Sequence, residues 1–394
     1  MTMNPSKVSG LILLAWFWLG LNYCIFMIFV PLSFPQDQDT LKSISWFIGI
    51  PAVFAILGQN FFGYICLKKD RFRQLLVLSF FSFTGLWLLM AFSIPNQILY
   101  PYLALHGFLV MAMIPSSKAL ITILYPQKKA EMIGKLYSFE SIGIAVSSVG
   151  IGLILEKYAS DPFIYQKLYA TMALANSIFI PCYWLSFPKQ LPELQWDILS
   201  AKAPGAFMRV MNTPGIRNLY IYLVLVSCGS SFYFFYFGRY LKNILGGTET
   251  QVGLSMTLAT LFGALSYPIY GKMMQTYGSY IGLCLCIISY VLCFLSLHLV
   301  QNPVVYLWIY ALPLYPMMTV ASNLFLANHT TEQDRGVGFG LLDTAFQTSG
   351  ILAPMLGIVI FSMASLEQLS LIAIAILVPA VFCLPGIKFH SYQR

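Results

Sequence analysis

Residues 187–218 read FPKQLPELQWDILSAKAPGAFMRVMNTPGIRN and form the one long polar stretch of the chain. Its prolines at positions 188, 192, 204 and 214 argue against a single continuous helix. Long apolar runs with short interruptions lie on both sides of it. Because the stretch falls near the middle of 394 residues, we interpret it as a linker between two membrane-embedded halves.

The composition indicates that the solvent of this chain is a lipid bilayer. Hydrophobic residues make up 58% of the sequence and charged residues only 9%, whereas soluble domains carry about 45–50% and about 25%. So few charges do not cover a surface exposed to water. The eight cysteines lie in apolar runs without the spacing of zinc ligands. We therefore expect no metal site, no cofactor and no nucleic-acid partner.

The apolar runs predict transmembrane helices, because each reaches the length of about 20 residues that a helix needs to cross a bilayer. The runs cover approximately 8–34, 42–67, 74–94, 98–124, 132–155 and 165–187 in the first half, and 216–242, 250–270, 279–299, 304–326, 336–362 and 367–386 in the second. Continuous runs favour helices over a β-barrel. The prediction is an all-α fold of twelve transmembrane helices: a six-helix bundle (1–187), a cytoplasmic linker (188–215) and a second six-helix bundle (216–394).

The basic residues alternate between the loops, which sets the expected orientation. With the N-terminus in the cytoplasm, Lys68, Lys69, Arg71 and Arg73 fall inside, as do most of the other lysines and arginines. This distribution obeys the positive-inside rule and accounts for the net charge of +8. Both termini are then cytoplasmic, and the short loops favour a plasma membrane of bacterial type.

The two halves resemble each other. Ile114-Pro115 near the end of the fourth run matches Tyr315-Pro316 in the tenth. The fifth and eleventh runs each begin with an aliphatic residue and a glycine, and each carries an acid several residues later, Glu140 and Asp343. Two repeats of six spans predict a pseudo-twofold axis along the membrane normal, with a solute site between the repeats near mid-bilayer.

The number of spans, the central linker and the repeat resemble the major facilitator superfamily over essentially the whole chain. That family carries a loop Gly-x-x-x-Asp-x-x-Gly-Arg-Lys after its second span. Here Gly63 and Arg71 match, while Leu67 and Asp70 replace the acid and the second glycine. The resemblance implies a cytoplasmic gate formed by this loop and its equivalent after the eighth span, with the candidates Gly63, Asp70, Arg71, Arg73, Gly271, Gln275 and Gly278. The alternative is that the basic residues only set the orientation.

Three charged residues lie within predicted spans, where each costs roughly 2.5–3.5 kcal/mol on insertion scales. Lys118, Glu140 and Asp343 all fall roughly 10–12 Å below the cytoplasmic surface. The functional hypothesis is that Glu140 or Asp343 binds and releases a proton as its access alternates, with Gln347 one turn beyond Asp343. The alternative is a structural ion pair between Lys118 and Glu140.

Solute contacts follow from the resemblance, which implies a cavity lined by spans 1, 4, 7 and 10. Polar and aromatic candidates there are Asn22, Tyr23, His106, Tyr233, Tyr236, Tyr310, Tyr315 and Asn323. Each has a role in packing as its alternative. His106 is the proton-sensitive candidate among them, because the ordinary pKa of histidine lies near neutrality. Small residues at Gly134, Ser138, Ser141, Ala145, Ser148 and Gly152 predict a close-packing face on the fifth span.

The predicted function is secondary active transport of a small organic solute by alternating access, with proton coupling, by a monomer in the bilayer. No constellation of catalytic residues argues for an enzyme. One alternative is an exporter of amphipathic compounds, although Leu103 stands where such exporters carry an arginine in span 4. Another is a membrane receptor on the same fold that does not transport.

Overall fold

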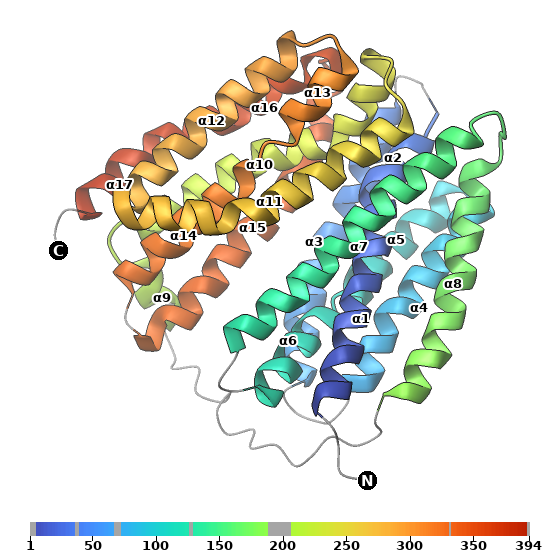
Figure 1. Cartoon of the computed structure of the whole chain (residues 1–394), viewed down its shortest axis with the longest axis horizontal. Coiled ribbons are helices and arrows are strands. Elements are labelled where there is room, and N and C mark those ends of the chain that lie inside the picture. The colour runs from blue at the N-terminus through green and yellow to red at the C-terminus, as the bar shows by residue number, and fades with distance from the viewer. Residues whose placement is uncertain are drawn as a thin grey trace. The chain divides into compact units, whose positions relative to one another are not determined.

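Only helices occur among the regular elements of the computed structural model, which describes residues 5–35, 39–66, 72–125, 129–187, 206–330 and 332–391 (Figure 1). Within these residues twelve helical segments are long and apolar enough to cross a membrane. They are Ser6–Ser33, Thr40–Gln59, Phe72–Ala91, Asn96–Ile121, Met132–Lys157, Ile164–Ser186, Ile216–Ile244, Glu249–Tyr277, Ser279–Leu299, Pro303–His329, Gly338–Ile360 and Leu366–Ile387. The prediction of an all-α fold with twelve spans is confirmed.

Several of these spans consist of more than one helix. In the first half the elements are α1 (Pro5–Cys24), the π-helical η1 (Ile25–Phe29), α2 (Val30–Ser33), α3 (Thr40–Cys66), α4 (Phe72–Ala91), α5 (Asn96–Val110), α6 (Met113–Leu124), α7 (Lys129–Lys157) and α8 (Ile164–Ser186). In the second half they are α9 (Ala206–Met211), α10 (Ile216–Arg239), the π-helical η3 (Tyr240–Ile244), α11 (Glu249–Tyr277), α12 (Ser279–Leu299), α13 (Pro303–Tyr310), α14 (Leu314–His329), α15 (Glu332–Ile360), the 3₁₀-helical η4 (Leu366–Gln368), α16 (Leu369–Leu377), the 3₁₀-helical η5 (Val378–Cys383) and α17 (Leu384–Ser391).

The chain divides into two units. The N-terminal unit comprises Met1–Pro35 and Trp46–Ala201, and the C-terminal unit comprises Gln36–Ser45 and Lys202–Arg394. The start of α3 is thereby counted with the second unit, in which Ser45 Oγ and the Tyr236 hydroxyl share a hydrogen bond of 2.6 Å. Most of the predicted linker, residues 188–205, lies outside the described residues.

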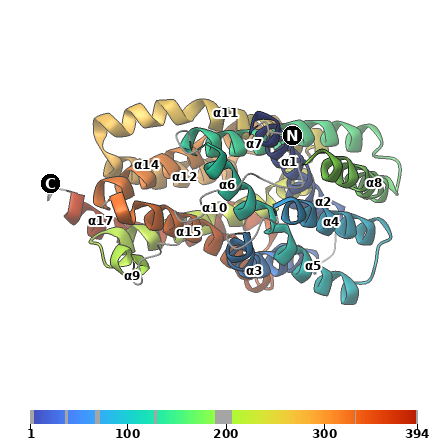
Figure 2. The same ribbon diagram turned by 90° about the horizontal axis from the view of Figure 1, so that it is seen from below.

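Both units pair their spans in the same order. In the N-terminal unit α1 packs on α7, and α4 packs on α8, so the first span contacts the fifth and the third contacts the sixth (Figures 1 and 2). In the C-terminal unit α10 packs on α15, and α12 packs on α16, which again joins the first span with the fifth and the third with the sixth. These two contacts are common to both units, as an internal repeat predicts, whereas the packing of α10 on α16 has only a weak counterpart between α1 and α8.

The fourth and tenth spans are interrupted at equivalent positions, which the continuous runs 98–124 and 304–326 did not predict. The first break, at Met111 and Ala112, separates α5 from α6, and the second, before Leu314, separates α13 from α14. A proline leaves the carbonyl four residues before it without its helical donor. Pro115 and Pro316 place that carbonyl at Met111 and Leu312, so the repeated proline accounts for both breaks.

A side chain from the third span satisfies the broken backbone of the fourth. The amide of Met113 donates to Ser79 Oγ at 3.1 Å, and the Ser79 hydroxyl donates to the carbonyl of Val110 at 2.9 Å. Freed backbone groups need such partners because the hydrocarbon core holds no water to replace them. Ser79 therefore stabilises the interruption between α5 and α6.

Ser79→Ala is expected to lower the thermal unfolding midpoint of the purified protein, because it leaves the Met113 amide unpaired. Hydrogen bonds within membranes contribute up to about 1–2 kcal/mol, so we expect a loss of that size. The matched control is Ser138→Ala, since Ser138 is exposed and donates to Gly134 of its own helix. Equal midpoints for the two variants would contradict the role given to Ser79.

Candidate functional site

A close approach between α1 and α7 brings Glu140 beside Tyr23. A Cβ atom added to Gly20 would lie 2.2 Å from the backbone oxygen of Glu140, and one added to Gly143 would lie 2.1 Å from that of Phe17. Neither position has room for any side chain, so the two backbones are as close as glycine allows. Tyr23 lies one turn beyond Gly20 on α1 and interacts electrostatically with Glu140.

Lys118 on α6 completes this group. It interacts electrostatically with Glu140, and its ammonium lies 5.0 Å from the centre of the Tyr137 ring. Trp16 supports the arrangement: its ring meets Tyr137 edge-on at 5.4 Å, and its Nε1 donates to Ser117 Oγ at 2.7 Å. We call Tyr23, Lys118, Tyr137 and Glu140 the charged cluster. The structure thus brings together two of the three charged residues that the sequence predicted within spans, and it adds Tyr137.

The third of these residues, Asp343, lies in the C-terminal unit. It is exposed on α15, and Gln347 is half-buried one turn further along the same helix. The sequence predicts that Asp343 and Gln347 lie one turn apart on the same helix, and their positions on α15 are compatible with this prediction.

Asn22 lies within a buried hydrogen-bond network of the N-terminal unit. Its Oδ1 accepts from Asn176 at 2.9 Å and from Trp87 at 2.7 Å, and its Nδ2 donates to the Trp18 carbonyl at 2.9 Å. The Asn176 Oδ1 also accepts from Trp18 Nε1 at 2.7 Å. The side chain of Asn22 thus has its hydrogen-bonding groups engaged within the protein, which favours the packing alternative at this position.

Asn176→Leu tests this network. The change removes the acceptor of Trp18 and a donor to Asn22, so we expect the unfolding midpoint to fall by the equivalent of about 1–2 kcal/mol. Thr171→Ala on the exposed side of the same helix is the control, because Thr171 bonds to Lys167 of its own helix. An Asn176 variant as stable as this control would show that the network adds nothing to stability.

His106 is buried and hydrogen-bonded. Its Nδ1 lies 2.7 Å from Ser82 Oγ, and the rings of Phe83 and Phe26 lie 4.7 and 5.6 Å from its own. Only 3% of its surface is exposed. The position fits the alternative stated for it, a histidine of the helical core, better than a role in binding protons.

The tyrosines of the C-terminal unit form an aromatic stack. The Tyr233 and Tyr306 hydroxyls share a hydrogen bond of 2.6 Å, and Phe237 stacks on Tyr310 at 4.2 Å. Tyr233 and Tyr236 are buried, and Tyr310 is half-buried. Sequence reasoning named Tyr233 and Tyr310 but missed Tyr306, although its spacing of four residues from Tyr310 places both on one helix face.

The remaining two solute candidates lie on α14. Tyr315 is half exposed, with its ring 5.8 Å from that of Phe346. Asn323 is half-buried and donates to the Thr319 carbonyl of its own helix at 2.8 Å.

The candidate gate residues are placed only in part. Asp70 and Arg71 lie outside the described residues, and Gly63 lies in the last turns of α3. Arg73 stacks its guanidinium on the Trp184 ring at 3.7 Å, which joins α4 to α8. In the second loop, Gly271 and Gln275 belong to α11 and Gly278 ends it. The φ of Gly278 is +85°, a conformation that favours glycine.

The predicted close-packing face on the fifth span is partly wrong. Ser148 does contact α1, with its Oγ 3.1 Å from Cys24 Sγ. However, Gly134 has no heavy atom within 4 Å of an added Cβ, and Ser138 is exposed. The close approach occurs instead at Gly143, because the face of α7 toward α1 is rotated from the small-residue stripe. Among the described residues, no group of three or more His, Cys, Asp or Glu side chains has the arrangement of a metal site.

Comparison with known proteins places this fold in a family. The family model of the Major Facilitator Superfamily matches residues 12–354 and 219–389, whereas the comparison with curated proteins gave no match. A bacterial homolog of the human lysosomal transporter Spinster, inward-facing and unoccupied, has a TM-score of 0.79 at 12% identity, covering 100% of this chain and 99% of that chain. The nucleoside transporter NupG has a TM-score of 0.74 at 13% identity, and the match covers 100% of this chain and 100% of that chain.

At these identities the two structures establish similarity of fold alone. The family model, by contrast, matches the sequence from the first span to the last. The chain therefore belongs to the Major Facilitator Superfamily, whose members are solute transporters of the membrane.

Proposed function

We propose that this protein is a secondary active transporter that moves a small organic solute by alternating access and couples the movement to protons through Glu140. The observation that carries the proposal is the charged cluster: a lysine and a glutamate from different helices interact within the membrane-spanning part of a transporter fold. A protein that served only as a scaffold would gain stability by replacing both charges with apolar residues.

The proposed coupling depends on how the surroundings of Glu140 change the free energy of its ionised carboxylate. While Lys118 is near and water has access, the carboxylate is stable as an anion. When the helices rearrange and its surroundings become dry, an unpaired carboxylate is costly, and a proton removes that cost. Glu140 would therefore take up a proton on one side of the membrane and release it on the other. Asp343, with Gln347, is the second candidate for this role.

The interrupted spans support the proposed movement. The first, fourth, seventh and tenth spans each contain a π-helical segment or a break. Such irregular turns mark places where a helix bends more easily than an ideal α-helix does. In the family these are the spans that line the cavity, and the exposed Tyr315 and the half-buried Tyr23 on them remain our proposed solute contacts. The orientation with both termini in the cytoplasm, the gate loops and the monomeric state also remain proposals.

An exporter of amphipathic compounds is the second candidate function. The aromatic content of 16% favours it, while the buried Leu103 occupies the position where the exporters' arginine is expected. A receptor without transport activity is less compatible with charges kept inside the spans.

The function is tested by uptake of a panel of radiolabelled solutes into proteoliposomes. The panel contains nucleosides, because of the similarity of fold to NupG, together with sugars, carboxylates, amino acids and lipophilic cations. We expect saturable uptake of at least one hydrophilic solute. Uptake of lipophilic cations alone would favour the exporter, and binding without uptake of any member would favour the receptor.

A further inference from the structure

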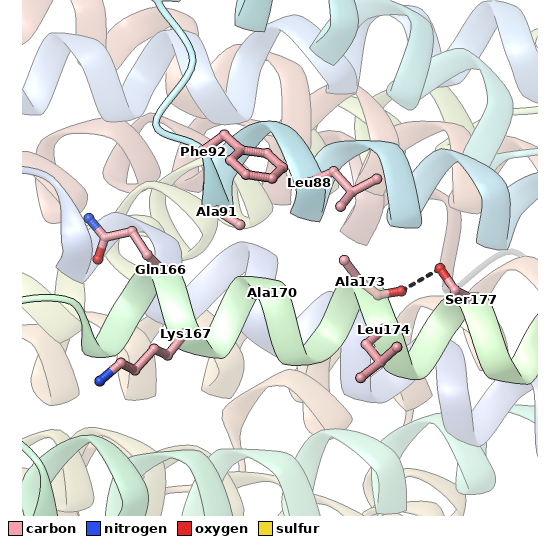
Figure 3. Close-up of a pocket in the computed structure, with 9 residues that line it drawn as sticks. All are labelled: Leu88, Ala91, Phe92, Gln166, Lys167, Ala170, Ala173, Leu174 and Ser177. Atoms are coloured by element: carbon pink, nitrogen blue, oxygen red, sulfur yellow. Dashed lines mark hydrogen bonds between the residues drawn. The ribbon is translucent and has the colours of Figure 1, made fainter.

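A groove of about 420 Å³ lies on the N-terminal unit, between the end of α4 and the first half of α8 (Figure 3). Leu88 lines it from α4 and Phe92 from the turn that follows α4, and Ala170 and Leu174 line it from α8. Polar side chains occur at the end nearest the loop that joins α7 to α8, where Gln166 and Lys167 lie in the first turn of α8. The groove is thus apolar along most of its length, with Gln166 and Lys167 at one end and Ser177, which donates to the Ala173 carbonyl of its own helix, at the other.

The apolar part of the groove suits a lipid chain. Phe92 is 74% exposed, Leu174 63% and Leu88 44%. All three lie in or next to segments that span the membrane, where hydrocarbon chains cover exposed apolar side chains. The lining extends along α8 from Gln166 to Ser177, which is roughly 16 Å of helix. One leaflet supplies about half of the ~30 Å hydrocarbon core, so the groove matches the length of one acyl chain.

The polar end carries one positive group and one unsatisfied acceptor, and Asp161 contacts the positive group from outside the groove lining. Lys167 Nζ lies 2.5 Å from Asp161 Oδ2, and 65% of the lysine side chain is exposed. Gln166 Oε1 is buried, yet it has no hydrogen-bond partner among the residues that the structure describes. In Figure 3 the Gln166 side chain leaves α8 on the side that faces α4, at the end of the groove, whereas the Lys167 side chain leaves α8 on the opposite side.

Asp161 is ionised at neutral pH. The Lys167 ammonium and the Phe163 amide, which donates to Oδ1 at 3.0 Å, hold the pKa of this carboxyl below its usual range. The pair at the end of the groove therefore has no net charge, which gives no preference for an anionic head group over a zwitterionic one. A zwitterion carries a partner for each member of the pair: its phosphate would face Lys167 and its ammonium would face Asp161.

The unsatisfied oxygen of Gln166 favours a zwitterionic head group that donates hydrogen bonds over one that does not. A buried acceptor without a donor costs about 1–3 kcal/mol, and a bound donor removes that cost. A primary ammonium provides N–H donors, whereas the quaternary ammonium of choline provides none. We propose that this groove binds one phosphatidylethanolamine molecule, with an acyl chain along α4 and α8 and the ammonium donating to Gln166.

The proposal is tested by measuring the lipid that stays bound to the full-length protein. The delipidated protein is incubated with equal amounts of phosphatidylethanolamine, phosphatidylcholine and phosphatidylglycerol of identical acyl chains, and the adducts are counted by native mass spectrometry. We expect the phosphatidylethanolamine adduct to exceed each of the others at least fivefold. Equal adducts, or a preference for phosphatidylglycerol, would overturn the proposal.

Two variants locate the bound lipid. Ala170→Trp fills the groove and is expected to remove the preferred adduct, whereas Ile178→Trp on the same helix, outside the groove lining, is expected to retain it. Gln166→Leu keeps the apolar groove and removes the acceptor, so phosphatidylethanolamine and phosphatidylcholine should then bind equally. A preference that survives in Gln166→Leu would contradict the proposed head-group contact, even if Ala170→Trp failed to fold.

Discussion

Glu140→Gln is expected to abolish the acceleration of solute uptake by a pH gradient, with a reduction of at least about tenfold in gradient-driven uptake. The amide has nearly the shape of the carboxyl group but carries no titratable proton. Exchange of labelled for unlabelled solute across the membrane requires no net proton movement, so it should persist in the variant. Parallel measurement of uptake and exchange in proteoliposomes separates lost coupling from lost transport.

Asp343→Asn is the companion variant, because Asp343 is the second carboxylate proposed for coupling. If Glu140 carries the proton, Asp343→Asn should retain the response to the gradient. The reverse result would transfer the role to the C-terminal unit. Gradient-driven uptake that stays intact in both variants would contradict the coupling assignment as a whole.

A double-mutant cycle distinguishes proton coupling from a structural ion pair. Lys118→Gln leaves Glu140 as an unpaired charge within the membrane, where one charge costs roughly 2.5–3.5 kcal/mol. Adding Glu140→Gln should recover much of that stability under either interpretation. If the pair is only structural, the double variant should also recover gradient-driven uptake. If Glu140 couples protons, the double variant should be stable but uncoupled.

Gly143→Leu is expected to prevent the N-terminal unit from folding, which is the largest effect on stability that we predict. A Cβ atom at this position would lie 2.1 Å from the backbone oxygen of Phe17, so α1 and α7 would have to separate. Overpacking of a core costs typically about 1–3 kcal/mol and more when backbone must move. The measurement is size-exclusion chromatography. The variant chain should be synthesised at a normal level but should lose its monodisperse peak.

Gly150→Leu is the matched control for Gly143→Leu. Gly150 lies on the same helix, and an added Cβ would have no heavy atom within 4 Å. The two substitutions have equal effects on helix propensity, so their difference isolates the contact with α1. A Gly143 variant that elutes and unfolds like the control would contradict the close approach that positions Glu140 against Tyr23.

The features that sequence alone predicted are those set by the bilayer. The length of each apolar run follows from the thickness of the hydrocarbon core, which is why the twelve spans could be counted from the sequence. The repeated Pro115 and Pro316 could also have predicted the interruptions of the fourth and tenth spans. The break that each proline causes four residues earlier was missed. Each of these properties depends on residues that are close together along the chain.

The features that were missed depend on which helix faces which. The sequence alone made Asn22 a candidate solute contact. Its hydrogen-bond partners Asn176 and Trp87 lie on other helices, so the residues near Asn22 in the sequence do not identify them. The stripe of small residues on the fifth span predicted a packing face, but the rotation of α7 is set by Gly20 and Gly143 together. Lys118 and Glu140 were expected at similar depth because both depths follow from counting residues along their spans, and the structure places them close enough to interact electrostatically.

The most direct test of the account is simultaneous measurement of solute uptake and proton flux by the wild-type protein in proteoliposomes. For a solute taken from the panel, an imposed pH gradient should drive accumulation above the external concentration, and adding the solute without a gradient should change the internal pH. Uptake that only equilibrates the solute, with no response of internal pH and no response to the gradient, would contradict proton-coupled transport by this chain.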